Sequence, residues 1–492
     1  MLLSPQRRNR RRCWILMLIC LFFVVIWRLA RKLRTRSRGS DSFGFSNINT
    51  SKDSVFADGC VDPLVYQDAP HYASQNASFT MLTRNSEIET VLKTVRSIER
   101  HFNQWYQYPY IFLNHEPFDP EFVELVTATT GAKVQFGVLS ELEWEFPPGL
   151  REQLIFKESI EEQGDRGILY GNLESYHKMC RFYAGAFYKH PLVAQYEWYW
   201  RIEPDVEFFC DLTYDPFYEM SRRGKKYGFT VFIEELYWTV PNLFRFTRSF
   251  IRRKGVKVGN LWPLVAKSYN SDFKNDDLLM KFINFDSDVE RELTKERKIK
   301  DLLDTVGNTK TSALDREALK LLIERASRKA PIFEDKFDDE EFNLCHFWSN
   351  FEIARVDLFS TGLYADYFAY LEESGGFWAE RWGDAPVHTL GLAMMLNVDD
   401  VHYFRDIGYQ HSTVVHCPIN KAGEQLPYVE TLKHQKLRHQ SGGTLQTFFD
   451  DITKVQEKES EFGVGCRCVC PTKRDVEDTS QCFRKWHDII RD

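Results

Sequence analysis

The sequence lacks the short motifs by which several large enzyme classes are recognised. It contains no Walker A motif, no G-x-S-x-G motif, and no G-x-G-x-x-G motif after the first predicted strand. These absences argue against a P-loop nucleotide hydrolase, a serine hydrolase and a dinucleotide-binding oxidoreductase. The sequence also shows no internal repeat, which argues against a repeat architecture.

Acidic residues are missing from one end of the chain. Residues 1–38 hold 11 Lys or Arg and no Asp or Glu, which leaves 53 basic against 71 acidic residues in the remainder. The net charge of −7 therefore averages a basic start and a body at −18. Such a body lacks the positive face that binds nucleic-acid phosphates, so we expect no nucleic-acid partner. The 492 residues are 43% hydrophobic and 15% aromatic, which is typical of a folded domain rather than a disordered, collagen-like or polytopic membrane chain.

The basic start surrounds one long apolar run. Residues 13–27 are apolar without interruption, and basic stretches flank them on both sides. We predict a cytoplasmic tail at 1–12, a transmembrane signal anchor at 13–30 and a stem at 31–76. A cleaved signal peptide is the alternative, but no small-residue cleavage site follows the run. Because five basic residues precede the run and six follow it, the positive-inside rule does not orient the anchor.

Cysteines and glycosylation sequons give the orientation instead. Nine of the 11 cysteines lie beyond the anchor, and four of them crowd the tail at 460–492. Sequons begin at Asn49 and Asn76, shortly after the anchor. Both features favour a lumenal body with disulfides. A metal site is the alternative for the cysteine-rich tail, although the paired C-x-x-C spacing is missing. Because nine is odd, at least one thiol stays free or pairs between chains.

Strand and helix patterns alternate from residue 77 onward. Short apolar strands are predicted at 79–83, 109–113, 133–139 and 197–202, and helices at 87–102, 121–129, 172–188 and 386–396. This alternation predicts an α/β domain at 77–492 with a mainly parallel or mixed sheet. Residues 271–341 differ, since 33 of these 71 residues are charged, and we expect a surface insertion there.

Carboxylates stand where the predicted fold places ligands. The strand that ends at Ile202 runs into Glu203 and Asp205, and ligands of open α/β sheets bind at the carboxyl ends of strands. Carboxylates there suit Mg²⁺ or Mn²⁺ together with a diphosphate. Glu352 ends an aromatic run, a setting typical of sugar-binding clefts. Two further segments, 375–388 and 404–411, bring acids and histidines together.

In this order, these segments closely resemble the fungal Golgi α-mannosyltransferases of the KTR family, which is glycosyltransferase family 15. The resemblance includes Y-W-R-I-E-P at 199–204, and it spans about residues 77–420 and the cysteine tail. The other matching stretches are 81–87, 110–114, 176–182, 345–352, 380–388 and 406–411. The resemblance implies a type II membrane protein with a GT-A-like lumenal domain that uses GDP-mannose and Mn²⁺ and retains the α configuration. The 271–341 insertion is longer than in similar proteins and bears on acceptor specificity.

The resemblance also assigns site residues. It places the metal-binding pair on Glu203 and His411, and the proposed nucleophile on Glu352. Asp384 and Tyr176 match residues near the donor or acceptor, and we count both as candidate catalytic residues.

Two more residues are candidates for cofactor binding. Arg84 matches the start of the half that binds guanosine diphosphate, and Asp205 is a second carboxylate beside Glu203. The choice of His411 over His388 as a metal ligand depends on the resemblance alone.

The expected function is a retaining, α-1,2-type mannosyltransferase of the Golgi membrane that acts on N-linked or O-linked glycans of glycoproteins. One alternative is a glycoside hydrolase that uses Glu203 and Glu352 as its carboxylate pair. The other alternative is a family member without catalysis that serves as a lectin or scaffold.

Overall fold

A computed structural model describes residues 55–57, 60–268, 336–337, 340–417, 464–471 and 475–491. All of them belong to the second of two compact units of the chain, Ser51–Asp492. The predicted tail, the predicted anchor and most of the predicted insertion lie outside the described residues. Within the described ranges, no helix is both long and apolar enough to cross a bilayer.

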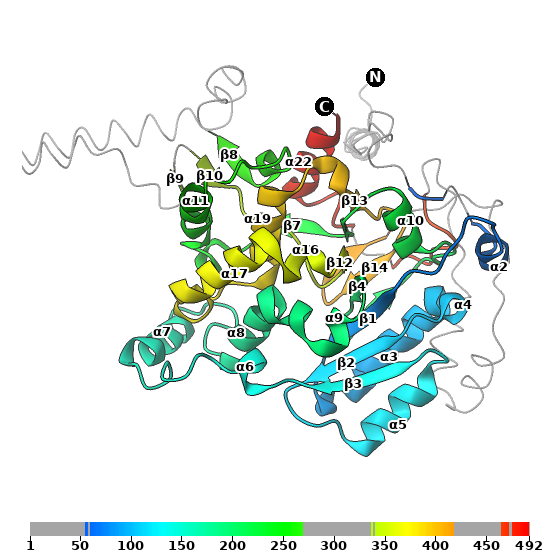
Figure 1. Ribbon diagram of the computed structural model, residues 1–492, viewed down its shortest axis with the longest axis horizontal. Coiled ribbons are helices and arrows are strands. Elements are labelled where there is room, and N and C mark those ends of the chain that lie inside the picture. The colour runs from blue at the N-terminus through cyan, green and yellow to red at the C-terminus, as the bar shows by residue number, and fades with distance from the viewer. Residues whose placement is uncertain are drawn as a thin grey trace, which may run out of the picture. The chain divides into compact units, whose positions relative to one another are not determined.

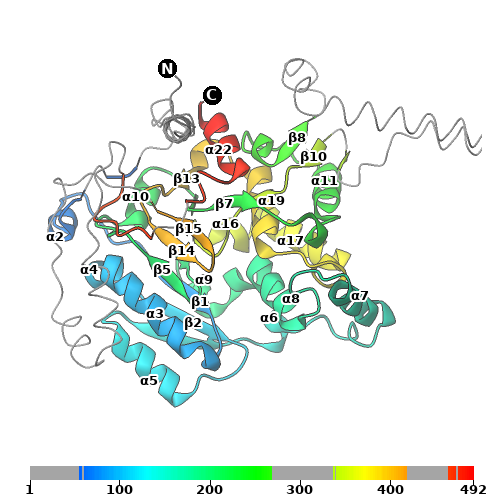
Figure 2. The same cartoon turned by 180° about the vertical axis from the view of Figure 1, so that it is seen from behind.

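A seven-stranded mixed sheet is the centre of the domain (Figures 1 and 2). Its strands are β1 (Ala77–Leu82), β2 (Tyr110–Asn114), β3 (Val134–Val138), β4 (Trp198–Arg201), β6 (Tyr227–Phe229), β12 (Glu352–Arg355) and β13 (Val401–Tyr403). They are ordered β13-β6-β12-β4-β1-β2-β3. Strand β12 runs antiparallel to both of its neighbours, whereas the other pairs are parallel. The predicted α/β class with a mainly parallel, mixed sheet is confirmed.

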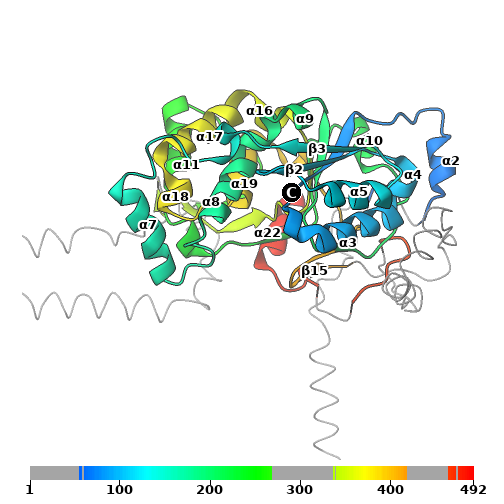
Figure 3. The same ribbon diagram turned by 90° about the horizontal axis from the view of Figure 1, so that it is seen from below.

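Helices cover both faces of this sheet, and Figure 3 shows α3 and α5 (Ile88–Ile98 and Pro120–Thr129) on one side with α9 and α16 (Pro191–Ala194 and Asp357–Ser360) on the other. The remaining helices are α2 (Pro63–Gln67), α4 (Gln104–Tyr106), α6 (Glu141–Trp144), α7 (Leu154–Asp165), α8 (Glu174–Arg181), α10 (Pro216–Arg222), α11 (Leu243–Lys254), α17 (Gly362–Ser374), α18 (Gly376–Ala379), α19 (Asp384–Met395) and α22 (Gln481–Arg491).

Many aromatic side chains of the sequence pack in the core, on both faces of the sheet. On one face, the ring of Phe79 lies 4.9 Å from that of Tyr110 and 5.1 Å from that of Trp200. The side chain of Tyr199 points to the other face, where Phe187 and Tyr188 pack against it. Every side chain named here is at most 1% exposed, so burial of large rings supplies much of the hydrophobic stabilisation.

One predicted helix is interrupted. Residues 172–188 form α8, then a π-helical turn at Phe182–Ala186 and a 3₁₀ turn at Phe187–Lys189. The backbone carbonyl of Tyr183, inside the π turn, lies 3.1 Å from Nε2 of His388. The π turn therefore lies at a tertiary contact. The periodicity of apolar residues in the sequence does not reveal such a contact, so the interruption of the helix was not predicted.

Three smaller sheets flank the main one. Their strands are β8 (Ala266–Ser268), β10 (Glu340–Phe342) and β9 (Lys336–Phe337) in the first, β7 (Phe232–Glu234) and β11 (Cys345–Phe347) in the second, and β15 (Val414–His416), β14 (Tyr409–His411) and β5 (Val206–Phe208) in the third. Strand β5 of the third sheet follows β4 after four residues, so this sheet begins near the edge of the main sheet at which ligands were expected.

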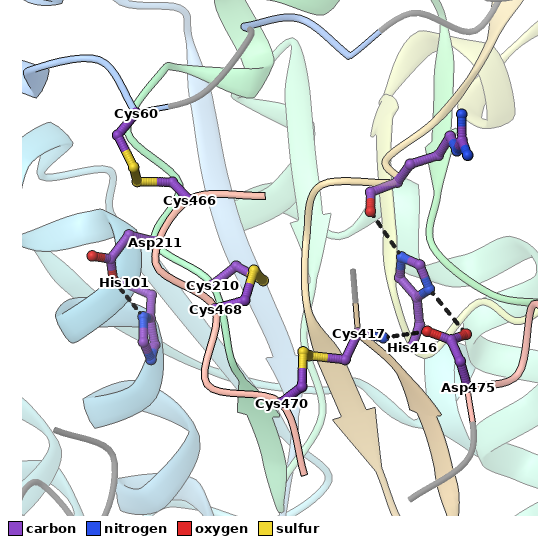
Figure 4. The surroundings of a disulfide bond; sticks show 11 residues. Cys60, His101, Cys210, Asp211, His416, Cys417, Cys466, Cys468, Cys470 and Asp475 are labelled. Atoms are coloured by element: carbon purple, nitrogen blue, oxygen red, sulfur yellow. Dashed lines mark hydrogen bonds and ion pairs between the residues drawn. A yellow bond between two sulfur atoms is a disulfide. The ribbon is translucent and has the colours of Figure 1, made fainter. Parts of the chain in front are cut away.

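Disulfides fasten the carboxyl-terminal tail to the rest of the domain, in part to the residues that follow β5 and β15 (Figure 4). The four bonds among the described residues are Cys60–Cys466, Cys210–Cys468, Cys417–Cys470 and Cys345–Cys482. The fourth bond holds α22, whose Trp486 packs on Phe229 with ring centroids 4.9 Å apart. Cys180 stays free and buried. The predicted disulfides of the body, with one thiol left over, are confirmed.

Candidate functional site

The predicted ligand-binding edge begins where β4 ends. Glu203 and Pro204 follow β4, and Asp205 then adopts a left-handed conformation with φ 62°, which Asp tolerates better than most residues. Glu203 is buried at 8% exposure, while the Asp205 side chain points outward and pairs with Lys93 at 2.9 Å. Of the two predicted strand-end carboxylates, only Glu203 therefore points into the protein.

Arg201 joins two of the predicted carboxylates. Its Nε donates to Oε1 of Glu203 at 2.7 Å, and its Nη1 donates to Oδ2 of Asp384. Asp384 is the first residue of α19, and the hydroxyl of Ser349 donates to it at 2.6 Å. The Arg201 side chain is 2% exposed and lies over the ring of Tyr183 at 3.4 Å. We call Arg201, Glu203, Ser349 and Asp384 the arginine cluster.

Burial acts differently on the two carboxylates of the arginine cluster. Desolvation raises the pKa of Glu203 above its ordinary value, against the opposing effect of Arg201. At Asp384, desolvation also raises the pKa, but Arg201, His388 and Ser349 together outweigh it, and the net pKa is lowered. Asp384 is therefore held as a carboxylate, and Glu203 is the group whose charge a bound cation would stabilise.

His411 reaches the same edge through the third small sheet. In the register of β14 and β5, His411 lies opposite Val206, three residues after Glu203. Its Nδ1 lies 3.1 Å from the side-chain amide of Asn350, and its ring lies 5.4 Å from that of Trp348. Burial lowers the pKa of His411, so the imidazole is neutral near pH 7, which is the form that binds metals.

Glu352 lies on the strand next to Arg201, in fully enclosed surroundings. It starts β12 opposite Arg201 and is 0% exposed. The hydroxyls of Tyr199 and Tyr227 donate to its two oxygens at 2.8 and 3.1 Å, and Nδ1 of His388 lies 3.2 Å from Oε2. We call these four residues the tyrosine–histidine pocket. Because its nitrogens contact Glu352, Tyr188 and the backbone of Tyr183, His388 is committed to this pocket.

Tyr176 and Arg84 occupy more open positions. Nη1 of Arg381 lies 3.3 Å from the hydroxyl of Tyr176, and Nη2 of the same guanidinium lies 3.5 Å from Glu235. Arg84 follows β1 at the sheet edge where β4 also ends, and its exposed side chain pairs with Glu87 at 2.6 Å. Arg201, Glu235 and Arg381 were not predicted as site residues from the sequence. Arg201 and Arg381 lie within the stretches that resemble the family, and this position is the signal in the sequence that could have identified them.

A large pocket lies elsewhere. It measures about 1090 Å³ between α6, α11 and α17, and none of the predicted site residues lines it. Two ion pairs lie among its lining residues, Arg181 with Glu372 and Lys254 with Asp366. Size alone therefore does not mark the site; the concentration of buried charge at the carboxyl edge of β4 does.

The residues at that edge fit a hard divalent cation. They offer a buried carboxylate at Glu203 and a neutral imidazole at His411. No group of three or more potential metal ligands occurs among the described residues. Two protein ligands are nonetheless a common number for Mg²⁺-like ions, which keep open positions for water and substrate phosphates.

The sequence matches the family described as "Glycolipid 2-alpha-mannosyltransferase" over residues 41–290 and 293–441. It is 50% identical over 480 residues to the Saccharomyces cerevisiae protein named "Probable mannosyltransferase KTR7", covering 96% of this chain and 88% of that protein. It is 45% identical to the Schizosaccharomyces pombe "O-glycoside alpha-1,2-mannosyltransferase homolog 5" over 75% of this chain and 77% of that protein.

A solved structure resembles the fold as well. It is core-mannan synthase A (CmsA/Ktr4) from Aspergillus fumigatus in its Mn/GDP form, with a TM-score of 0.54 and 31% sequence identity. The match covers 77% of this chain and 85% of that protein.

Proposed function

The chain belongs to glycosyltransferase family 15 and is a mannosyltransferase, and we propose that it transfers mannose from GDP-mannose to mannose-containing glycans with retention of the α configuration. The observation that carries this proposal is the convergence of Glu203, His411 and the arginine cluster at one edge of the sheet. A solved relative was crystallised with Mn and GDP, which supports the same donor here.

Glu203 and His411 would hold Mn²⁺, which supplies positive charge to the diphosphate of the leaving GDP. Arg201 would keep the Glu203 carboxylate ionised and aimed at this edge. Arg84 stands at the neighbouring strand end with an exposed guanidinium, a position suited to the nucleotide. Asp384, kept charged by Arg201 and Ser349, would orient a sugar hydroxyl by accepting a hydrogen bond from it.

Glu352 would stabilise positive charge at the reacting sugar rather than attack it. A covalent nucleophile needs one oxygen free to approach the anomeric carbon, whereas both oxygens of Glu352 accept hydrogen bonds and the residue is 0% exposed. An enclosed carboxylate still acts through space, because the low-dielectric interior screens its charge weakly. This arrangement favours front-face transfer.

We further propose an α-1,2 linkage, N-linked or O-linked glycoprotein acceptors, and a place in the Golgi membrane with the body in the lumen. The name of the relative from Schizosaccharomyces pombe supports the linkage and an O-linked acceptor. The apolar run at 13–27 supports an anchor, and the sequons at Asn49 and Asn76 and the four disulfides support a lumenal body.

The test incubates the full chain with GDP-mannose, Mn²⁺ and a panel of mannosides. We expect a transfer product whose new linkage is α by NMR, and loss of that product on removal of Mn²⁺ by a chelator. Absence of both transfer and Mn²⁺-dependent GDP binding would refute the proposal. Release of free mannose from glycans without GDP would favour the hydrolase, and glycan binding without transfer would favour the lectin or scaffold.

Substitutions of single residues test the role that is proposed for each of them. Glu203→Gln and His411→Ala should weaken GDP binding in the presence of Mn²⁺, whereas Glu352→Gln should keep GDP binding and lower kcat at least about 100-fold. Glu207→Gln is a matched control, because this carboxylate lies on β5 and pairs with Lys93 at 2.8 Å. Mass spectrometry of the enzyme during turnover should find no mannosyl adduct on Glu352; such an adduct would establish the covalent route.

A further inference from the structure

A cavity of about 480 Å³ lies at the end of the main sheet opposite to the arginine cluster. Its wall includes Trp198, the first residue of β4, and Arg355, the last residue of β12, which are partners in the register of these strands. Arg201 and Glu352 are partners at the other end of the same two strands. The cavity is therefore separate from the candidate active site, and its volume is typical of sites for small molecules.

The wall of this cavity is positively charged. It holds the three cations Lys225, Lys226 and Arg355 against one carboxylate, that of Asp357. Lys226 also pairs at 3.0 Å with Asp400, which is not part of the wall. The chain beyond residue 38 has a net charge of −18, so a positive cavity contrasts with the rest of this body. Such a local excess of positive charge attracts anions.

The indole of Trp198 provides a buried donor without a partner. Trp198 is 1% exposed, and its Nε1 has no hydrogen-bond partner among the described residues. The backbone of Trp198 pairs with Ala77 on β1 and with Arg355 on β12, so its side chain is the part that faces the cavity. A buried N–H that bonds neither protein nor water costs free energy, and a ligand that accepts a hydrogen bond from it would remove this cost.

Arg355 provides a second donor at the same place. Its Nε and Nη2 donate to the carboxylate of Asp357 at 2.9 and 2.7 Å, which leaves Nη1 without a partner in the described ranges. The guanidinium carbon of Arg355 lies 5.8 Å from the centre of the Trp198 ring. A charged donor and a neutral donor are therefore close enough to hold different oxygens of one anion.

We propose that this cavity binds a phosphate group, either as inorganic phosphate or as part of a small phosphate ester. The phosphate oxygens would accept hydrogen bonds from Nε1 of Trp198 and Nη1 of Arg355, while Lys225 and Lys226 would offset the negative charge. A volume of about 480 Å³ also leaves room for an organic group beside the phosphate. The inference does not depend on the proposed transferase reaction, because none of the residues assigned to that reaction lines the cavity.

The first test is isothermal titration calorimetry of inorganic phosphate into the full chain, in the absence of Mn²⁺. We expect saturable binding, and Arg355→Met should raise the Kd at least about tenfold because a charged donor is lost. Lys254→Met is the matched control, since this cation pairs with Asp366 at 2.8 Å outside the cavity, and it should keep the wild-type Kd. Absence of saturable binding, or equal losses in both variants, would overturn the inference.

The second test places the bound phosphate by NMR. In the full chain with ¹⁵N-labelled tryptophan, the indole signal of Trp198 is the one that disappears in Trp198→Phe. Phosphate should shift this signal, since its N–H gains an acceptor. An unshifted Trp198 signal would overturn the inference. So would phosphate binding that is lost in Arg84→Met and kept in Arg355→Met, because the phosphate would then lie at the nucleotide edge.

A third titration distinguishes the two sources of the phosphate group. Mannose 6-phosphate, a phosphate ester of a sugar, replaces inorganic phosphate in the same calorimetric experiment. Binding about tenfold tighter than that of inorganic phosphate would assign the cavity to a phosphorylated sugar. Equal or weaker binding of the ester would assign it to free phosphate. In either case Arg355→Met should weaken the binding, and an ester that binds equally well to Arg355→Met would not occupy this cavity.

Discussion

The arginine cluster and the tyrosine–histidine pocket both bury carboxylates beside β4, but they neutralise them differently. Glu203 and Asp384 share the cation Arg201, whereas Glu352 is met by two hydroxyls and an imidazole. The guanidinium of Arg201 is always charged, so it offsets the negative charge of Glu203 and Asp384 directly. Hydroxyl dipoles stabilise a carboxylate without neutralising it, so Glu352 keeps an electrostatic effect on its surroundings. The first region holds one cation against two carboxylates and so suits a bound divalent cation, and the second suits a developing positive charge.

Removal of Arg201 should have the largest effect on stability, because it abolishes the ion pairs that distinguish the arginine cluster from the tyrosine–histidine pocket. Arg201→Met leaves two buried carboxylates without their cation, and loss of one partner from such a network costs about 3–5 kcal/mol of unfolding free energy. Denaturant unfolding at pH 7 measures this loss. Arg355→Met is the control, since Arg355 pairs with the exposed Asp357 at 2.7 Å and should cost at most about 1 kcal/mol.

Two further substitutions should restore the stability that Arg201→Met loses. Adding Glu203→Gln and Asp384→Asn to Arg201→Met removes the unpaired charges and should restore most of the lost stability. Equal losses in Arg201→Met and Arg355→Met would mean that the arginine cluster is not held by its cation.

The two halves of the main sheet differ in how far the sequence predicts them. The strands β1, β2 and β3 and the helices α3 and α5 were predicted within a few residues, because their apolar spacing is local. The strands β6, β12 and β13 were not predicted, since runs of three or four residues show no reliable period. They become strands only by pairing with residues far away in the sequence, as Ile353 does with Trp200.

The site follows the same rule. Glu203 was predicted from its place after a strand, and Glu352 from its aromatic neighbours. Arg201 could not be assigned a role, because Asp384, one of its partners, lies 183 residues away. His388 and His411 were equivalent in the sequence. Before the structure, the family resemblance alone favoured His411; the fold now separates them, since it commits His388 to Glu352 and brings His411 to the start of β5.

A fourth buried carboxylate, Asp406, lies at a third place in the core, where fewer groups stabilise its charge. The hydroxyl of Tyr214 donates to its Oδ2 at 2.7 Å, and its Oδ1 has no partner among the described residues. Burial raises the pKa of Asp406 from 3.8 to about 6, against the smaller opposing effects of Tyr214, His416 and Arg405. Neither a full cation pair nor a full set of donors holds this charge.

A raised pKa means that the folded state binds the proton more tightly than the unfolded state does. This contribution to stability is complete below pH 3.8 and is lost as the pH rises through about 6. Over that window it amounts to at most about 3 kcal/mol. Asp406→Asn should therefore flatten the decline in unfolding free energy between pH 4 and pH 7. The exposed Asp399→Asn should keep the wild-type decline, and an unchanged slope in Asp406→Asn would contradict the assignment.

The smallest effect tests the tyrosine–histidine pocket itself. Tyr199→Phe removes the hydroxyl that donates to Glu352 at 2.8 Å, and a hydrogen bond to a charged group contributes about 1.5 kcal/mol or more. In a Glu352→Gln background the same change should cost only about half as much, because the acceptor is then neutral. A double-mutant cycle from denaturant unfolding measures this coupling.

Tyr409→Phe is the control, since its buried hydroxyl has no partner within the described ranges and its removal should cost almost nothing. Equal costs of Tyr199→Phe in both backgrounds would show that Glu352 carries no charge in its pocket, and its proposed action on a positive sugar centre would then lose its physical basis.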